Sequence, residues 1–386
     1  MKKFISIITM FFLIFGLTAC GTKSNTSEVS SEATNEKVDL SDVTIGIVGY
    51  SDSGTAYNSI VANYNQISEA TGIKFKFVKG SSFDETVNVT AVQNLISSGC
   101  NGIIMTMDSG MVSIMKEANA AGVYMAGFLN SMDQSIEKIK DDKYFLGTVS
   151  DGYLDGSKIG EKAAELVIRD KKKNVGVVTY PHNYFPTHAQ ADKAFRASIE
   201  DHNSKATEED KINVYESVQL SFKPLEPTYF QQNPELDGIF GMGLTFVYPT
   251  MLTANIKDVT LYSTGYDTAE SYVQGFDSGV IGMETCSNTE SLIYPVALIA
   301  NAVKGKQFAD KPVSAEAVET NTVFLTNKEE LSTFQEKAIY HSGDATHSLL
   351  KNEDISNLIM ATNENATYKD LVQTIQSWSI EDIQKK

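Results

Sequence analysis

The chain has 386 residues, of which 42% are hydrophobic and 21% are charged. This composition excludes a wholly disordered, collagen-like or disulfide-scaffold protein, and the length favours two domains over a single core. Lysine and arginine together number 32 against 49 aspartates and glutamates, which gives a net charge of -17. Most of such a surface repels phosphate, so the composition argues against binding to nucleic acid or to an anionic membrane surface.

Residues 1–20 have the pattern of an export signal. Two lysines precede an apolar run that ends at Leu17, and the stretch is too short for a membrane-spanning helix. The ending LTAC is similar to the lipobox of bacterial lipoproteins, in which the cysteine, here Cys20, receives a diacylglyceryl group and becomes the new N-terminus. We therefore expect residues 1–19 to be a signal peptide and the mature protein to be extracytoplasmic, anchored to the cell membrane by lipid. A plain secretory signal with an accidental cysteine is the alternative.

Residues 20–42 carry almost no large apolar side chain, so they cannot offset the entropy of ordering and are expected to form a flexible tether. Two further cysteines, Cys100 and Cys286, lie far apart in the sequence. A domain of this size needs no disulfide, so buried thiols are the favoured interpretation, and a disulfide between the two is the alternative.

From residue 43 onward, short β-branched runs alternate with longer helical patterns. Strands are predicted at 44–49, 73–78, 102–107, 123–128, 174–180, 236–241, 259–264 and 280–285. Apolar residues at helical spacing follow several of these runs, and Gly72, Gly99 and Gly122 stand where helices should end. This alternation predicts parallel sheets with helices on both faces. Residues 203–235 are harder to interpret because prolines interrupt them, and the chain after residue 325 has a polar, helical pattern without a specific role.

Three stretches resemble the sugar-type family of type I periplasmic binding proteins, the substrate-capture subunits of bacterial ABC transporters. They are NLISSGCNGIIMTMDS at 94–109, SDGYLDGSKIGEKAAE at 150–165 and LYSTGYDTAE at 261–270. Their order and spacing extend the resemblance over residues 43–325. It implies an α/β fold of two doubly wound parallel-sheet lobes joined by three crossings of the chain, with a small ligand held between the lobes and an ABC permease as the partner.

The resemblance also implies where the lobes divide. The crossings would lie near residues 150–152, 285–287 and 320–322. The N-terminal lobe would comprise residues 43–150 plus 286–320, and the C-terminal lobe residues 151–285 plus 321–386. A ligand between such lobes agrees with the independent rule that ligands bind beyond the carboxyl ends of parallel strands.

Polar and aromatic side chains follow the predicted strands, where that rule places a ligand. Carboxylates accept hydrogen bonds from sugar hydroxyls, and aromatic rings stack on the apolar face of a sugar or a nucleobase. The predicted ligand-binding residues are Tyr50, Ser51, Asp52, Tyr57, Asp108, Asn130, Asp151, Tyr180, His182, Tyr184, His188, Phe246, Tyr266 and Asp267.

Each of these residues has a structural alternative. Asp108 and Asp267 match acidic ligand contacts of the family by position, but aspartate is also favoured as a helix N-cap. Asp151 would equally cap a hinge turn, and the aromatic residues would equally pack within their loops. His182 and His188 lack the spacing of a helical metal-binding pair, so they are expected to face solvent or ligand, and no metal or cofactor is expected.

The sequence departs from the family in lacking cleft arginines. Leu129 and Asn130 stand where sugar binders commonly place an Asp-Arg pair, and Ala191 stands where an arginine is often found. The only arginines, Arg169 and Arg196, fall on predicted helices. The predicted lining therefore holds four aspartates and no lysine or arginine, so we expect a neutral or cationic ligand, foremost a sugar or a sugar-like compound.

Rival functions find less support in the sequence. The common motifs of serine hydrolases, zinc proteases, P-loop NTPases and dinucleotide-binding enzymes are absent, so the chain is not expected to be an enzyme. A ligand-sensing lipoprotein that reports to a membrane sensor kinase or chemoreceptor would show the same sequence features, and a nucleoside or signalling molecule could replace the sugar. We expect a monomer that delivers its solute to the permease.

Overall fold

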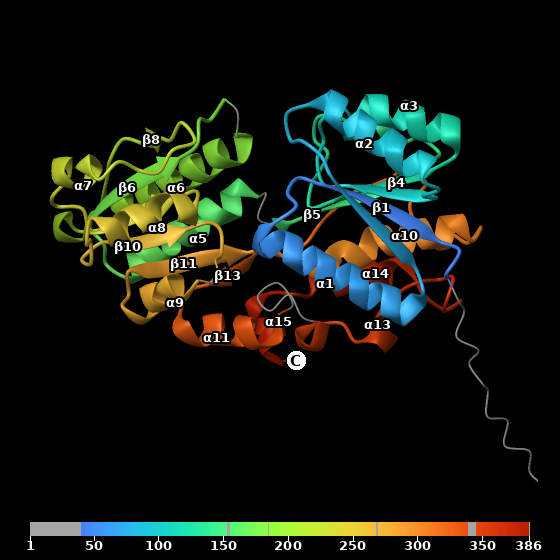
Figure 1. The fold of residues 1–386 in the computed structure, drawn as a ribbon. Helices are drawn as coiled ribbons and strands as arrows, with labels where there is room; N and C mark the ends of the chain where they lie inside the picture. Colours follow the sequence, from blue (N-terminus) through green and yellow to red (C-terminus); the bar gives the residue numbers. More distant parts are fainter. Residues whose placement is uncertain (1–39, 153–154, 184, 268, 339–344, 386) are drawn as a thin grey trace, which may run out of the picture. The chain divides into compact units, whose positions relative to one another are not determined.

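The computed structural model describes residues 40–152, 155–183, 185–267, 269–338 and 345–385. These residues form two mostly parallel β-sheets with helices packed against them (Figure 1). We call each sheet, together with the helices that pack on it, a lobe. The predicted fold class is confirmed, because both sheets are doubly wound with helices on their two faces. The predicted leader and tether, with Cys20, lie outside the described residues. Within these ranges, no helix is long and apolar enough to cross a membrane.

The first lobe contains a sheet in which every strand pair is parallel. Its strands are β1 (Thr44–Gly49), β2 (Lys74–Lys79), β3 (Gly102–Met105), β4 (Tyr124–Phe128), β5 (Phe145–Ser150) and β12 (Ala317–Glu319), in the order β12-β5-β4-β3-β1-β2. Its helices are α1 (Gly54–Thr71), α2 (Glu85–Ser97), α3 (Met111–Ala121), α4 (Ile136–Ile139), the 3-10 helix η3 (Thr289–Leu292) and α10 (Ile293–Val303). Figure 1 shows α2 and α3 on one face of this sheet and α1 with α10 on the other.

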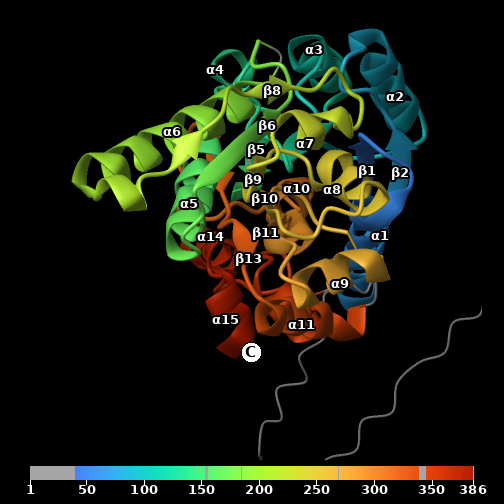
Figure 2. The ribbon, with the colours of Figure 1, turned by 90° about the vertical axis from the view of Figure 1, so that its left-hand side faces the viewer.

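The second lobe contains a parallel sheet with one antiparallel edge strand. Its strands are β6 (Asn174–Thr179), β7 (Asn213–Val214), β8 (Val218–Gln219), β9 (Gly238–Gly241), β10 (Thr260–Ser263), β11 (Ile281–Cys286) and the antiparallel β13 (Val323–Leu325), in the order β13-β11-β10-β9-β6-β7 with β8 beside β6. Its helices are α5 (Gly156–Arg169), α6 (Pro186–Lys205), η2 (Glu208–Asp210), α7 (Thr228–Gln232), α8 (Leu244–Thr253) and α9 (Glu270–Asp277). Figure 2 shows α5 and α6 on one side of the strands and α8 and α9 on the other.

The central strands are almost continuous apolar runs because helices cover both of their faces. In β1 every residue after Thr44 is buried, and all four residues of β3 are buried. This is the pattern expected for parallel strands in a doubly wound sheet, where no face is open to water. The sequence therefore shows short β-branched runs here rather than a strict alternation of apolar and polar residues.

The chain passes between the sheets where β5, β11 and β12 end. Two of these segments touch, since the Thr320 amide donates to the Ser150 carbonyl at 3.0 Å and the Gly152 amide donates to the Thr320 hydroxyl at 3.2 Å. A β-carbon at Gly152 would lie 2.3 Å from the Thr320 carbonyl oxygen, so only glycine fits this crossing. The lobe boundaries inferred from the sequence stay predictions.

The C-terminal tail, residues 326–386, adds helices that contact both lobes. They are α11 (Lys328–Lys337), η4 (Ala345–His347), α13 (Asn352–Asn357), α14 (Tyr368–Gln376) and α15 (Ile380–Lys385). Helix α11 packs on α9 and β13, and α15 packs on α11 and β13. Helix α13 packs on α1, and α14 packs on α10, so part of the tail contacts helices of the first lobe.

The two cysteines within the described residues are buried, free thiols, as the favoured interpretation of the sequence had it. Cys100 follows α2, and Cys286 ends β11. Burial raises the pKa of both thiols, so both stay protonated and unreactive at neutral pH.

Candidate functional site

The candidate residues of the first lobe lie at the carboxyl ends of its parallel strands. Tyr50, Ser51 and Asp52 follow β1, Asp108 follows β3 and Asn130 follows β4. Tyr57 lies in the first turns of α1, where its ring meets the edge of Phe77 at a centroid distance of 4.9 Å, and Asp151 follows β5 as a buried residue. We name Tyr50, Ser51, Asp52, Tyr57, Asp108, Asn130 and Asp151 the first half-site.

Asp52 is paired with a lysine, which corrects the expectation that no lysine or arginine accompanies the candidate acids. The Lys79 ammonium lies 2.9 Å from Asp52 Oδ1, and both side chains are about half exposed, at 56% and 54%. The pairing follows from the sheet register, since β1 and β2 are parallel and Gly49 lies opposite Lys79 at their carboxyl ends. The hydrogen bond from Lys79 lowers the pKa of Asp52, so this carboxylate stays ionised.

Asp108 and Asn130 are joined by the loop that follows β4. Asp108 Oδ2 accepts from the Gln134 amide at 2.7 Å, and its Oδ1 accepts from the Ser135 hydroxyl. Asn130 Oδ1 accepts from the Met132 amide at 2.8 Å. Asp108 does not act as the N-cap of α3, which was the structural alternative. It stabilises a loop from the neighbouring strand instead.

Tyr50 and Ser51 extend the first half-site towards solvent. The Tyr50 side chain is 43% exposed, and its amide donates to the Thr106 hydroxyl at 3.0 Å. The Ser51 hydroxyl donates to the Ser53 carbonyl at 2.9 Å, in the turn before α1. The loop after β1 is thus held by a bond to the Thr106 side chain and by a bond within the loop, and it presents one aromatic ring.

The second lobe gathers aromatic rings around Tyr180, directly after β6. The rings of Phe185, His188, Phe222 and Phe246 all lie 5.2 to 5.4 Å from the Tyr180 ring, measured between centroids. We name these five residues the aromatic cluster. Phe222 stacks on Tyr180 at an interplanar angle of 26°, is 56% exposed and has a left-handed backbone φ of 57°. An exposed aromatic residue in that conformation is unusual and marks the loop after β8 as a candidate ligand contact.

Sequence reasoning predicted three members of the aromatic cluster, Tyr180, His188 and Phe246, and missed Phe185 and Phe222. Phe222 lies in the proline-interrupted stretch 203–235, whose short strands β7 and β8 have no periodic signal. Phe185 directly precedes Pro186, the first residue of α6, and that proline was an available signal for a loop residue at a helix start. Tyr184 lies outside the described residues.

The two candidate histidines differ in their surroundings. His188 is 7% exposed, so it does not face solvent, and its contact with a ligand, the other predicted alternative, stays a prediction. Its Nδ1 accepts from the Tyr180 amide at 3.0 Å. Burial lowers the pKa of His188 to about 4, which keeps this ring uncharged. His182 Nε2 lies 3.1 Å from the Thr179 hydroxyl. Within the described parts of the chain, no three His, Cys, Asp or Glu side chains come together as a metal site would require.

A cavity of about 320 Å³ opens beside the aromatic cluster, at the carboxyl ends of β9, β10 and β11. It is lined by Tyr180, Phe246 and Tyr266 and by the hydroxyl-bearing residues Thr245, Thr264, Thr285 and Ser287, of which Thr264 has its own oxygen closed to solvent. Among the described residues that line it there is no carboxylate, lysine, arginine or histidine. We name it the second-lobe cavity, and its lining is polar without being charged.

Two glycines shape the loops around the second-lobe cavity. Gly243 and Gly265 have φ values of 135° and 96°, which only glycine adopts without strain. The Gly265 amide donates to the Thr285 hydroxyl at 2.9 Å, so the Thr285 hydroxyl hydrogen is still available to a ligand. Asp267 is not among the lining residues. Its Oδ1 accepts from the Ala269 amide at 2.8 Å, but Ala269 itself precedes α9, so Asp267 is not the N-cap of that helix.

Glu284 on β11 is a buried acid that the sequence analysis did not single out. It is 1% exposed, and neither carboxyl oxygen has a hydrogen-bond partner among the described residues. Burial, with a smaller contribution from the charge of Asp267, raises the pKa of Glu284 to about 9. The group is therefore protonated at neutral pH and adds no charge near the second-lobe cavity.

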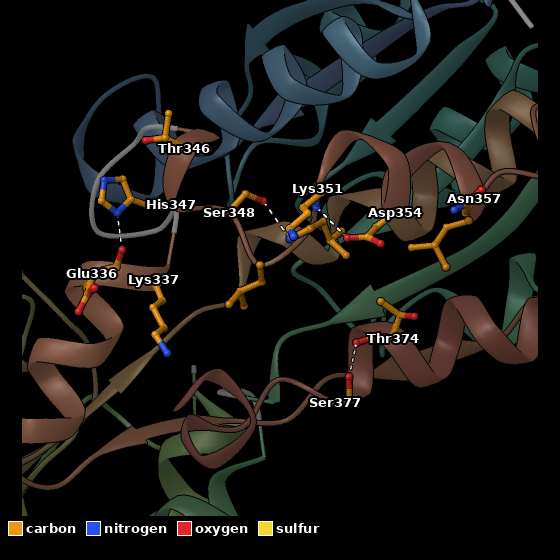
Figure 3. Close-up of a pocket in the computed structure, with 13 residues that line it drawn as sticks. Glu336, Lys337, Thr346, His347, Ser348, Lys351, Asp354, Asn357, Thr374 and Ser377 are labelled. Atoms are coloured by element: carbon orange, nitrogen blue, oxygen red, sulfur yellow. Dashed lines mark hydrogen bonds between the residues drawn. The ribbon is translucent and has the colours of Figure 1, made fainter. Parts of the chain in front are cut away.

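A larger cavity lies elsewhere, in the C-terminal tail (Figure 3). It measures about 690 Å³ and is lined by residues of α11, α13, α14 and the segment Thr346–Lys351. Its polar groups largely bond to one another, as when the Lys351 amide donates to Asp354 at 2.9 Å. No predicted site residue lines this cavity, and it lies at no strand end, so we do not assign the ligand to it.

Comparison with known proteins gives a family and a fold. The model of the periplasmic binding protein domain matches residues 45–307. Among solved structures, the chain is similar to an ABC transporter solute-binding protein from Burkholderia graminis in complex with D-arabinose, with 14% sequence identity, a TM-score of 0.57, and coverage of 76% of this chain and 98% of that chain.

Two further solved structures have the same fold. An arabinose-binding protein from Geobacillus stearothermophilus has 15% identity, a TM-score of 0.58, and coverage of 76% of this chain and 99% of that chain. A solute-binding protein from Agrobacterium vitis bound with alpha-D-tagatopyranose has 17% identity, a TM-score of 0.56, and coverage of 75% and 96%. At these identities the likeness shows the fold alone. No curated protein matches the sequence.

Proposed function

The chain belongs to the periplasmic binding protein family, and from that premise we propose that it is a lipid-anchored solute-binding protein that captures a small neutral ligand outside the cytoplasm. The ligand is a sugar or a sugar-like compound, held between the first half-site and the second-lobe cavity. The protein then delivers this solute to the permease of an ABC transporter, and it performs no catalysis of its own.

The uncharged lining of the second-lobe cavity carries this proposal. A hydroxyl group both donates and accepts hydrogen bonds, so the hydroxyls of Thr245, Thr285 and Ser287 match the hydroxyls of a neutral polyol. The rings of Tyr180 and Phe246 are nearly perpendicular, and the face of either one can supply an apolar surface for the face of a sugar ring that carries only hydrogens. A pocket with apolar walls and a few polar groups is the usual form of a small-molecule site.

The charges of the first half-site also favour a neutral ligand. Asp52 is neutralised by Lys79, and both oxygens of Asp108 already accept hydrogen bonds. Neither side chain supplies the positive charge that an anionic ligand would need when it leaves water. We propose that the first half-site contributes oriented hydrogen-bond acceptors to an uncharged molecule.

The remaining parts of the proposal come from the sequence and from the relatives. The lipobox-like LTAC supports a lipid anchor on Cys20, and the family supports an extracytoplasmic location and a transporter partner. The solved relatives that carry D-arabinose and alpha-D-tagatopyranose support a sugar as the ligand class. The predicted lobe boundaries, the monomeric state and the set of ligand contacts belong to the proposal.

Mass spectrometry of the compound that copurifies with the full chain tests the ligand class. We expect a neutral sugar-like molecule, which then binds the emptied protein in a calorimetric titration while its phosphate ester does not. An anionic copurifying compound, or binding of the ester as tight as that of the parent sugar, contradicts the proposal. If a nucleoside copurifies instead, the protein is still a solute-binding protein, but its ligand is a nucleoside rather than a sugar.

The anchor is tested separately by the mass of the mature N-terminus. We expect a diacylglyceryl group on Cys20, and release of the Cys20→Ser variant from the membrane fraction. Membrane retention of that variant would contradict the lipid anchor.

A further inference from the structure

The C-terminal tail reaches the lining of the second-lobe cavity through α11. This helix begins after Asn327, whose side chain accepts from the Glu330 amide at 3.0 Å, while the Glu330 carboxylate accepts from the Thr326 amide at 2.7 Å. Leu331 and Phe334 follow about one turn apart and are both buried, and the helix packs on α9, β13 and α15 (Figure 1). The matched family domain ends before the tail, so the comparison assigns α11 no role.

Phe334 packs against Tyr266, one of the residues that line the second-lobe cavity. The two ring centroids lie 5.2 Å apart at an interplanar angle of 76°, so the edge of one ring meets the face of the other. Phe334 is 2% exposed and Tyr266 is 8% exposed, so water is largely excluded from this contact. In a close-packed interior one ring of such a pair can move only if the other gives way.

Tyr266 is the last of three consecutive residues, Thr264, Gly265 and Tyr266, that line the cavity. The first two are held by hydrogen bonds within the second lobe. The Leu244 amide donates to the Thr264 carbonyl at 2.8 Å, and the Gly265 amide donates to the Thr285 hydroxyl at 2.9 Å. The tail thus contacts the lining at the residue that follows these two.

A second contact brings the tail close to the cavity lining at Ser287. This residue lines the second-lobe cavity and also a separate, small space of about 10 Å³. The tail residues that line the small space are Phe334, Ala338, Leu349 and Ile383. The same phenylalanine therefore lies beside two members of the cavity lining, Tyr266 through its ring and Ser287 across the small space.

Helix α11 has anchors that do not involve the Phe334 ring. The Lys328 ammonium lies 2.6 Å from Asp277 Oδ1 of α9, and the Lys337 ammonium donates to the Gln384 carbonyl of α15 at 3.2 Å. Removing the ring of Phe334 should therefore leave the helix in place and change the surroundings of Tyr266.

We propose that Phe334 is a positioning residue of the ligand site, which holds Tyr266 in the position that the bound molecule requires. The tail is then a working part of the site, although it lies beyond the matched domain. This inference rests on the proposed function, because that proposal seats the ligand in the second-lobe cavity. Without the Phe334 ring, Tyr266 can shift into the space that the ring leaves, and the cavity is no longer preorganised for its ligand.

Crystal structures of the emptied natural protein and of Phe334→Ala test the contact without any ligand. We expect the Tyr266 ring in the variant to move towards residue 334 or to take more than one conformation, while Tyr180 and Phe246 keep their places. A Tyr266 ring that stays in one unchanged position overturns the proposal.

Calorimetry with the compound that copurifies with the natural protein tests the effect on binding. We expect Phe334→Ala to weaken the affinity about threefold to tenfold, and Phe334→Leu, which refills most of the space, to weaken it less. The matched control is Leu371→Ala on α14, the tail helix that packs on α10. It removes a buried side chain that does not line the cavity.

The control separates positioning from a general loss of stability. Leu371→Ala should lower the unfolding temperature about as much as Phe334→Ala and leave the affinity unchanged. Unchanged affinity in Phe334→Ala, or an equal loss in Leu371→Ala, overturns the proposal.

The positioning role and the proposed function fail in different ways. If the natural protein binds no small neutral compound, the proposed function fails, and the crystal structures still decide whether Phe334 holds Tyr266. If the natural protein binds such a compound in the second-lobe cavity and Phe334→Ala binds it equally well, the positioning role alone is refuted.

Discussion

The carboxyl side chains in the two halves of the candidate site have opposite surroundings. In the first lobe, Asp52 and Asp108 are paired with a lysine or with loop donors, and they stay at or near the surface. In the second lobe, Glu284 is buried with no hydrogen-bond partner among the described residues and is neutral at pH 7, and the described residues that line the second-lobe cavity carry no charge. Carboxylates at strand ends thus hold loops in the first lobe, whereas rings and hydroxyl-bearing residues line a cavity in the second.

The largest expected effect comes from Glu284. Its pKa is raised from 4.5 to about 9 in the folded protein, so between these values the folded protein keeps a proton that the unfolded chain loses. Stability should therefore fall as pH rises through this window, by up to about 1.4 kcal/mol per pH unit. Glu284→Gln removes this slope and should be more stable than the natural protein by on the order of 3 to 5 kcal/mol near pH 8.

Urea unfolding of both proteins from pH 5 to pH 9 measures this difference. The matched control is Glu161→Gln on the exposed face of α5, which should leave the pH slope unchanged. Parallel stability curves for Glu284→Gln and the natural protein would show that Glu284 is ionised in the folded state.

Removing one ring of the aromatic cluster should have the next largest effect. Phe246→Ala takes away a wall of the second-lobe cavity, so the affinity for the copurifying ligand should fall by about 1.5 to 3 kcal/mol. Calorimetry measures this loss. Phe83→Ala, at a position 83% exposed in the first lobe and outside the half-site, should bind as the natural protein does. Equal binding by the two variants would place the ligand outside the second-lobe cavity.

Asp108→Asn should affect stability more than binding. The change weakens the bonds from Gln134 and Ser135, which costs about 1 to 2 kcal/mol of unfolding free energy. Because a carboxamide oxygen still accepts hydrogen bonds, ligand affinity should fall less than in Phe246→Ala. Thermal unfolding measures the loss of stability, and calorimetry on the same protein preparation measures the loss of ligand affinity. A larger loss of affinity than in Phe246→Ala would contradict this expectation and make Asp108 a principal ligand contact.

Asp52→Asn should have the smallest effect. The pair with Lys79 is exposed on both sides, and exposed ion pairs contribute little to stability. We expect no measurable change in the unfolding temperature and a slightly stronger salt dependence of ligand binding, because Lys79 is left unpaired. A marked loss of stability would show that this pair is structural.

Much of the fold could be predicted from the sequence because its central strands are short, almost continuous apolar runs that alternate with amphipathic helices. The strands at 44–49 and 102–107 and the helix ending before Gly305 have strong periodic signals, and all are present. The strand β5 was missed, since Gly147 with a φ of 134° interrupts its pattern. The two- and three-residue strands β7, β8, β12 and β13 are too short for periodicity to show.

The candidate site was predictable in position but not in chemistry. The rule that ligands bind at the carboxyl ends of parallel strands led to Tyr180, Phe246 and Tyr266, which line the second-lobe cavity. It could not reveal that Lys79 meets Asp52, because that contact depends on the register of β1 and β2. The stacking of Phe222 on Tyr180 and the burial of Glu284 without a hydrogen-bond partner among the described residues were equally hidden, because both depend on packing between residues far apart in the sequence.

The contacts of the C-terminal tail could not be predicted from the sequence either. Its amphipathic helices could be expected, but not the bond that docks them, in which the backbone amide of Leu349 donates to the buried carboxylate of Glu290 at 2.9 Å. Glu290 follows β11 directly after the crossing, and Gln66 of α1 donates to the Leu350 carbonyl at 2.6 Å. Such contacts join residues far apart in the sequence and become visible only in the folded chain.

A crystal structure of the protein with its copurified ligand is the most direct test of the central claim. The account predicts an uncharged molecule whose ring lies against Tyr180 and Phe246 and whose hydroxyls bond to the Thr285 side chain. A ligand that carries a negative charge at that position, or one seated in the cavity of the C-terminal tail while the second-lobe cavity holds only water, would contradict it.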